Sequence, residues 1–253
     1  MSFAPALNTT RLAQRYSELL LAGDRSAVRE MIDQALSNGL TAGAMLSELV
    51  WPTMESLQEL YRLDRVTQLQ LNLATRLNRQ IADQLAGRLP MAQKNDRKVL
   101  IFCGDAEPEE LGGQITADLF EAAGYTVRFG GGGVANDEVL KMIGDFRPNL
   151  LVMFATLAAG VPNVRKLIDY LREVNSCPEM QVMCCGGIYK RAEGLSDEIG
   201  ADLYAADGHC AVDVAETQRT RRASFEQQSV GRTRRIKKAA IRRAERDDVA
   251  EAA

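Results

Sequence analysis

Short apolar runs alternate with helix-like segments in the second half of the chain, and this alternation limits the possible folds more than any other feature. The runs are Val99–Cys103, Thr126–Phe129, Leu150–Phe154, Gln181–Cys185 and Asp202–Ala205. Mostly unbroken apolar strands that alternate with helices predict a parallel sheet covered on both faces. The expected helices lie at about 111–123, 137–146, 164–174 and 188–199.

Apolar side chains recur at helical spacing throughout the first third of the chain. Residues 11–22, 27–37, 41–61 and 67–88 predict four helices, with Pro52 kinking or restarting the third. We therefore expect an α/β protein in three parts. A four-helix bundle occupies residues 1–92, a five-stranded Rossmann-like or flavodoxin-like domain residues 93–217, and a basic, flexible tail residues 218–253.

The near-neutral formal charge of −3 conceals an uneven distribution. The segment from Arg219 to Arg246 contains eleven Lys or Arg and two acidic residues, so the preceding part of the chain is acidic. Such a basic segment predicts contact with nucleic acid or an acidic protein, or else acts only as a solubilising end. No helix-turn-helix or zinc-finger pattern indicates the reading of a particular DNA sequence. The basic side chains proposed for this contact are Arg232, Arg234, Arg235, Lys237, Lys238, Arg242 and Arg243.

The chain contains a single histidine, His209, and five cysteines. One histidine excludes a multi-histidine metal site and any catalytic triad that does not use His209. The odd number of cysteines and the absence of paired C-x-x-C spacings indicate reduced thiols in a cytoplasmic protein. No apolar run is long enough to span a membrane, and the first residues do not resemble a signal peptide. No set of residues predicts catalysis by the protein alone.

Small residues follow every expected strand, in the pairs and runs Gly104-Asp105, Gly130–Gly133, Ala155-Thr156, Gly186-Gly187 and Ala206-Asp207. The carboxyl ends of parallel strands meet at one edge of the sheet, where ligands of such folds bind. The sequence therefore predicts a roomy site lined by backbone at this edge.

A helical bundle followed by this sheet resembles the cobalamin-binding module of methionine synthase, corrinoid carrier proteins and light-sensing regulators. The resemblance covers about residues 12–217. It rests on Leu20–Asp24, Ala35–Gly39, Phe154–Leu157 and Ile199–Asp202, together with the glycines at the strand ends. It implies a cobalamin or related tetrapyrrole cofactor. The cofactor-binding residues that it implies are Asp105, Glu109, Gly112, Thr156, Leu157, Gly186, Gly187 and Tyr61, with Thr156 and the two glycines lining the channel for the nucleotide tail.

The chain departs from the family where cobalt would be coordinated. The family's loop reads Asp-x-His-x-x-Gly, whereas the loop from Asp105 to Gly112 is two residues longer and contains no histidine. Glu109 takes the histidine position when counted back from Gly112, and Glu107 when counted forward from Asp105. A carboxylate is a harder donor than imidazole, so the family's axial ligation is not expected. On the other face Tyr61 replaces the family's tryptophan, and we expect Trp51 in core or interface packing.

Two further features have both a functional and a structural interpretation. His209 is a candidate axial or metal ligand or a tetrapyrrole contact, but a loop histidine bonded to backbone is the more common case. The acidic residues at 105–110 suit a hard cation such as Mg²⁺, or simply a solvated helix N-terminus, which we favour.

The sequence favours a non-catalytic ligand-sensing or regulatory protein. It would bind a tetrapyrrole without the family's histidine, or have lost the ligand and kept the scaffold. A corrinoid carrier for methyl transfer, with a methyltransferase partner, and a ligand-free interaction protein are the alternatives. We also expect a homo-oligomer such as a dimer, since bundles of this kind often pair.

Overall fold

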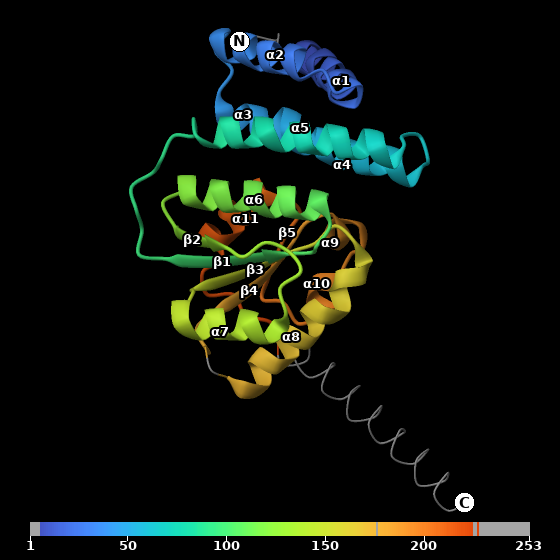
Figure 1. Cartoon of the computed structure of the whole chain (residues 1–253). Helices are drawn as coiled ribbons and strands as arrows, with labels where there is room; N and C mark the ends of the chain where they lie inside the picture. Colours follow the sequence, from blue (N-terminus) through green and yellow to red (C-terminus); the bar gives the residue numbers. More distant parts are fainter. Residues whose placement is uncertain (1–5, 176, 225–226, 228–253) are drawn as a thin grey trace, which may run out of the picture.

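The computed structural model describes residues 6–175, 177–224 and 227, and shows a helical cap on one face of an α/β domain (Figure 1). Five α-helices and one π-helical turn, η1, form the described part of the cap. They are α1 (Ala6–Ala22), α2 (Arg25–Ser37), α3 (Ala42–Met45), η1 (Leu46–Val50), α4 (Trp51–Arg62) and α5 (Gln68–Ala86). The predicted bundle is therefore present, with its third helix divided into three segments.

Side-chain caps fix where the cap helices begin. The Asp24 carboxylate accepts the backbone N–H of Ala27, and Thr41 accepts that of Ala44. Thr67 and Gln70 form a reciprocal capping box at the start of α5. These bonds satisfy backbone donors that a helix N-terminus leaves free, which is why each turn ends where it does.

The π-helical turn η1 directly precedes the helical segment that contains Pro52. Trp51 donates its backbone N–H to the carbonyl of Leu46, five residues back. Pro52 follows this turn in the first turn of α4, so the wider i to i+5 turn lies where the residue without a backbone N–H enters the helix. The irregularity expected at Pro52 is therefore a π-helical turn within a continuous helix.

Five parallel strands form the sheet of the α/β domain in the order β2-β1-β3-β4-β5. They are β1 (Lys98–Cys103), β2 (Thr126–Phe129), β3 (Leu150–Phe154), β4 (Gln181–Cys185) and β5 (Leu203–Ala205). This is the flavodoxin-like order, and the predicted fold class is confirmed. The order reverses between β1 and β3, so the two connections leaving these strands diverge at their carboxyl ends.

Helices cover both faces of the sheet (Figure 1). α6 (Glu107–Ala122) and α11 (Gly208–Thr217) lie between the sheet and the cap, while α7 (Asn136–Phe146) and α8 (Val161–Val174) cover the opposite face. The helix expected over 188–199 is instead two short helices, α9 (Gly187–Arg191) and α10 (Leu195–Glu198). Gly194 has a φ of 78°, a left-handed conformation that interrupts the helix.

The cap and the α/β domain share one hydrophobic core. Buried side chains of the cap, such as Tyr16 and Ile81, belong to the same cluster as Phe120 of α6 and Ile101 of β1. A second cluster lies on the α7 and α8 face of the sheet. Within the described ranges, no helix combines the length and apolarity that crossing a membrane requires.

Candidate ligand site between the cap and the sheet

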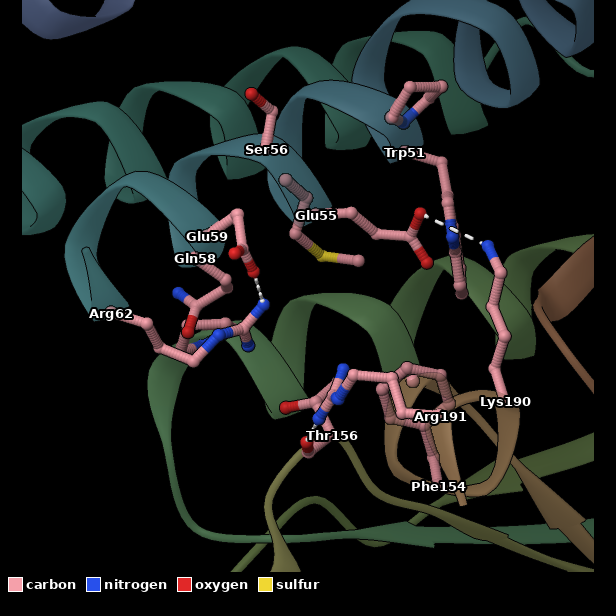
Figure 2. Close-up of a pocket in the computed structure, with 14 residues that line it drawn as sticks. Trp51, Glu55, Ser56, Gln58, Glu59, Arg62, Phe154, Thr156, Lys190 and Arg191 are labelled. Atoms are coloured by element: carbon pink, nitrogen blue, oxygen red, sulfur yellow. Dashed lines mark hydrogen bonds and ion pairs between the residues drawn. The ribbon is translucent and has the colours of Figure 1, made fainter. Parts of the chain in front are cut away.

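A cavity of about 380 Å³ lies where α4 meets the carboxyl ends of β3 and β4 (Figure 2). Four of its lining residues, Trp51, Glu55, Gln58 and Arg62, follow one another on α4 at spacings of four, three and four. This spacing places them on one face of the helix. The opposite wall includes Pro108, Phe154, Thr156, Gly187, Lys190 and Arg191.

An aromatic contact closes one side of the cavity. The rings of Trp51 and Phe154 meet edge to face, with centroids 5.8 Å apart and an interplanar angle of 88°, a geometry that aromatic pairs prefer. Trp51 is only 5% exposed. Phe154 also packs against Gly112, where any side chain would overlap its ring. The contact therefore joins the cap directly to the sheet.

Charged side chains surround the rest of the cavity (Figure 2). Lys190 Nζ lies 3.5 Å from Glu55 Oε2 across the interface, and Arg62 pairs with Glu59 along α4. Arg191 donates to the carbonyl oxygen of Thr156 and forms no ion pair with the described residues. The lining thus contains three cations and two carboxylates, and no carboxylate in the described part of the chain pairs with Arg191.

Three buried polar atoms of this lining have no hydrogen-bond partner. They are Trp51 Nε1, Gln58 Nε2 and Thr156 Oγ1, half of the six such side-chain atoms in the described part of the chain. A buried polar group without a partner costs free energy, so such atoms are rare and call for an explanation. All three belong to residues that line this cavity, which makes it the candidate ligand site.

The loop that corresponds to the family's axial-ligand loop faces into the protein. Glu109 is 3% exposed, and its Oε1 accepts the backbone N–H groups of Thr156 at 2.7 Å and Leu157 at 3.0 Å. Its carboxylate also fills the space where Gly104 would carry a side chain. Glu109 therefore holds the loop that follows β3.

Glu107, the other candidate for the histidine position, is also engaged. Arg79 of α5 donates to Glu107 Oε1 at 3.0 Å and lies 3.6 Å from Glu110 Oε2. The carboxylates of Glu107 and Glu109 are thus both engaged in contacts within the protein. This loop does not fit axial coordination of cobalt. The described ranges also contain no group of three or more His, Cys, Asp or Glu arranged to hold a metal ion.

His209 lies in the first turn of α11 and is not among the residues lining the cavity. The adjoining Gly208 packs against Thr116 of α6, which places this turn beside α6. Burial lowers the pKa of His209 from its ordinary value, although Asp207 and Asp213 oppose the shift. Its Nε2 is buried and has no hydrogen-bond partner among the described residues.

The other residues proposed from the sequence are divided among several places. Thr156 and Gly187 line the cavity, while Glu109 and Gly112 support its wall from behind. Tyr61 is 37% exposed and lies outside the lining, as does the exposed Leu157. Gly186 packs on the carbonyl oxygen of Ala155 with a φ of 108°. The basic residues proposed between Arg232 and Arg243 lie outside the described residues.

A second cavity of about 590 Å³ opens between the ends of β1 and β3, on the α7 and α8 face of the sheet. Asp105, Gly131 and Gly133 line it, which accounts for part of the glycine run after β2. Burial, with the charges of Glu110 and Glu109, raises the pKa of Cys103 in its lining to about 12. The sulfur is therefore a neutral thiol rather than a reactive thiolate.

Sequence reasoning missed several residues of the cavity lining, namely Gln58, Arg62, Lys190 and Arg191, and it placed Trp51 only in packing. A signal for them was present. Trp51 begins a stripe of polar residues on one face of a helix. Lys190 and Arg191 follow closely after the Gly-Gly turn, at the sheet edge where ligands bind.

The structure is a helical cap on a Rossmann-like domain, with a cavity where the two meet. Residues 12–86 match the B12 binding domain family. A corrinoid protein of Desulfitobacterium hafniense (strain Y51) is 27% identical over 118 residues, which cover 47% of this chain and 54% of that protein. The alignment thus spans about half the length of this relative.

A solved structure shares this fold. The monomethylamine corrinoid protein of Methanosarcina barkeri superposes with a TM-score of 0.73 and 18% identity, covering 81% of this chain and 97% of that one. A methanol:cobalamin methyltransferase complex from Methanosarcina barkeri matches at a TM-score of 0.46 and 16% identity, covering 86% and 83%, too low a score to support a conclusion. The cap sequence and the fold confirm the resemblance to the cobalamin-binding module family.

Proposed function

We propose that this chain is a non-catalytic binding module that holds a corrinoid or related tetrapyrrole at the cavity between cap and sheet. No protein side chain would coordinate the metal, since Glu107 and Glu109 are both engaged elsewhere. The observation that carries the proposal is the group of three unpartnered polar atoms in a cavity of a corrinoid-binding fold. We propose a sensing or regulatory role, in which occupancy of the cavity alters the contacts between cap and sheet.

The size of the cavity limits how such a ligand would bind. Pockets for drug-sized ligands hold roughly 300–1,000 Å³, and the cavity lies near the lower end of that range at about 380 Å³. A corrin is considerably larger than a drug-sized ligand. Only one edge of the macrocycle would therefore enter, with the remainder lying outside the cavity or displacing the Trp51–Phe154 contact.

A titration with hydroxocobalamin, methylcobalamin, adenosylcobalamin and haem, followed by visible spectroscopy, tests the proposal. We expect binding of at least one of them, with any cobalamin keeping its own base on the metal. Binding should persist in His209→Ala and weaken in Trp51→Leu. Tyr61→Leu, a change on the same helix outside the cavity, serves as the matched control.

The titration also defines what would contradict the proposal. If none of the four compounds binds, the chain is better described as an interaction scaffold that kept the fold without the ligand. A spectrum that shows a protein ligand on the metal, and loses that signature in His209→Ala, would overturn the claim that no side chain coordinates it.

A corrinoid carrier for methyl transfer is the second candidate, favoured by the sequence similarity to a corrinoid protein. A carrier has to deliver the methyl group of bound methylcobalamin to a separate methyltransferase, whereas a sensor does not. Loss of that methyl group when a cobalamin-dependent methyltransferase and its acceptor are added would favour the carrier. Retention of the methyl group with every enzyme tried would favour the sensor.

A further inference from the structure

We infer that the cavity between cap and sheet recognises free carboxylates, so that its ligand is an acidic tetrapyrrole rather than a fully amidated one. The inference rests on the proposed function and adds the chemical class of the ligand edge that enters the cavity. It follows from the kind of polar atoms that lack partners and from the balance of charge in the lining.

Two of the three unpartnered atoms are donors only. The indole Nε1 of Trp51 and the amide Nε2 of Gln58 can donate but cannot accept, while Thr156 Oγ1 can do either. An ionised carboxylate is an acceptor-only group with two oxygens, so it can satisfy such donors without adding a donor of its own. A primary amide would bring an NH₂ group that needs an acceptor in turn.

The charges of the lining favour the same group. Lys190 and Arg62 are paired with Glu55 and Glu59, whereas Arg191 donates to the neutral carbonyl of Thr156 and forms no ion pair within the described ranges. The guanidinium of Arg191 matches a carboxylate with two parallel hydrogen bonds, and a bond between charged partners is stronger than a neutral one. Arg191 lies against Gly187, where a Cβ on the glycine would be 2.8 Å from Nη1, so the guanidinium packs closely on this part of the wall.

Two corrinoids with the same ring separate the alternatives. Dicyanocobyrinic acid carries free carboxylates at the corrin periphery, whereas dicyanocobinamide carries amides. We expect the full-length protein to bind the acid about tenfold more tightly or better, the effect of one charge-assisted hydrogen bond, as measured by calorimetry. Arg191→Gln should remove most of this preference, and Trp51→Phe, which keeps the ring and loses the N–H, should reduce it.

Lys166→Gln is the matched control, because it removes one positive charge at the second cavity and should leave the preference unchanged. Equal or tighter binding of the amidated corrinoid overturns the inference while the proposed function stands. A preference that survives in Arg191→Gln also overturns it. Failure to bind either corrinoid, haem or any cobalamin overturns both. Thermal unfolding of each variant shows whether it is folded.

Discussion

Replacement of Glu109 separates a structural carboxylate from a metal ligand. In Glu109→Ala the backbone N–H groups of Thr156 and Leu157 lose their shared acceptor. A hydrogen bond to a charged group contributes about 1.5–3 kcal/mol, so the loss of both bonds should amount to about 3–6 kcal/mol of the free energy of unfolding. For a chain of this length that corresponds to a fall in Tm of roughly 6–24 °C.

The isosteric variant Glu109→Gln provides the internal comparison. Both N–H groups donate to the same oxygen, Oε1, so an amide oxygen can replace it and only the charge is lost. We expect a loss of about 1 kcal/mol, measured by urea unfolding and by the thermal transition in circular dichroism. Glu107→Ala is the control, because its partly exposed pair with Arg79 should contribute less than about 1 kcal/mol.

The result that would refute the reasoning is an unchanged stability in Glu109→Ala together with an altered visible spectrum of a bound corrinoid. That combination would assign Glu109 to the metal. The same logic extends to Glu109→His, which restores the family's residue. Because the side chain points to the loop after β3, this variant should be destabilised by an amount similar to Glu109→Ala and should leave the cobalt without a protein ligand.

Three further predictions concern other parts of the molecule. Gly112→Ala should lower stability by about 1–3 kcal/mol, because its methyl group overlaps the Phe154 ring; the loss should shrink when Phe154→Leu is added, as a double-mutant cycle by urea unfolding would show. Burial and neighbouring carboxylates raise the pKa of Asp118 to about 6, so its ionisation weakens the fold as pH rises from about 4 through 6. Asp118→Asn should therefore stabilise the protein at pH 7 by about 1–2 kcal/mol and not at pH 4, and an equal effect at both pH values would contradict this cause. Glu55→Gln should change stability by less than about 1 kcal/mol yet tighten binding of a carboxylate-bearing corrinoid in calorimetry, since it releases Lys190; weaker binding would count against an anionic ligand.

The sequence predicts the sheet well because each strand is a distinct run of apolar residues bounded by polar or small ones. All five strands lie where these runs predict them. The break in the helix expected over 188–199 was missed because a glycine is compatible with a helix as well as with the left-handed turn at Gly194. Similarly, Pro52 indicates that a helix restarts, but not that a π-helical turn precedes it.

The candidate site could be predicted only to the level of the sheet edge. Topology brings the loops after the strands together, and glycines mark where they do. The inward direction of Glu109 depends on two backbone N–H groups more than forty residues away, and Trp51 meets Phe154 from a different part of the fold. Such contacts depend on how distant segments pack together. The spacing of residues within one helix or strand does not predict them.

The continuous core beneath α6 has a thermodynamic consequence for the whole molecule. Because buried side chains of the cap and the sheet belong to one cluster, neither part can unfold without exposing apolar surface of the other. A compound held at their junction therefore stabilises both at once by mass action, with a gain that grows with its free concentration over its Kd. The Tm of the whole protein should therefore rise when a compound binds at this junction. Thermal unfolding can detect such binding even when the ligand has no chromophore.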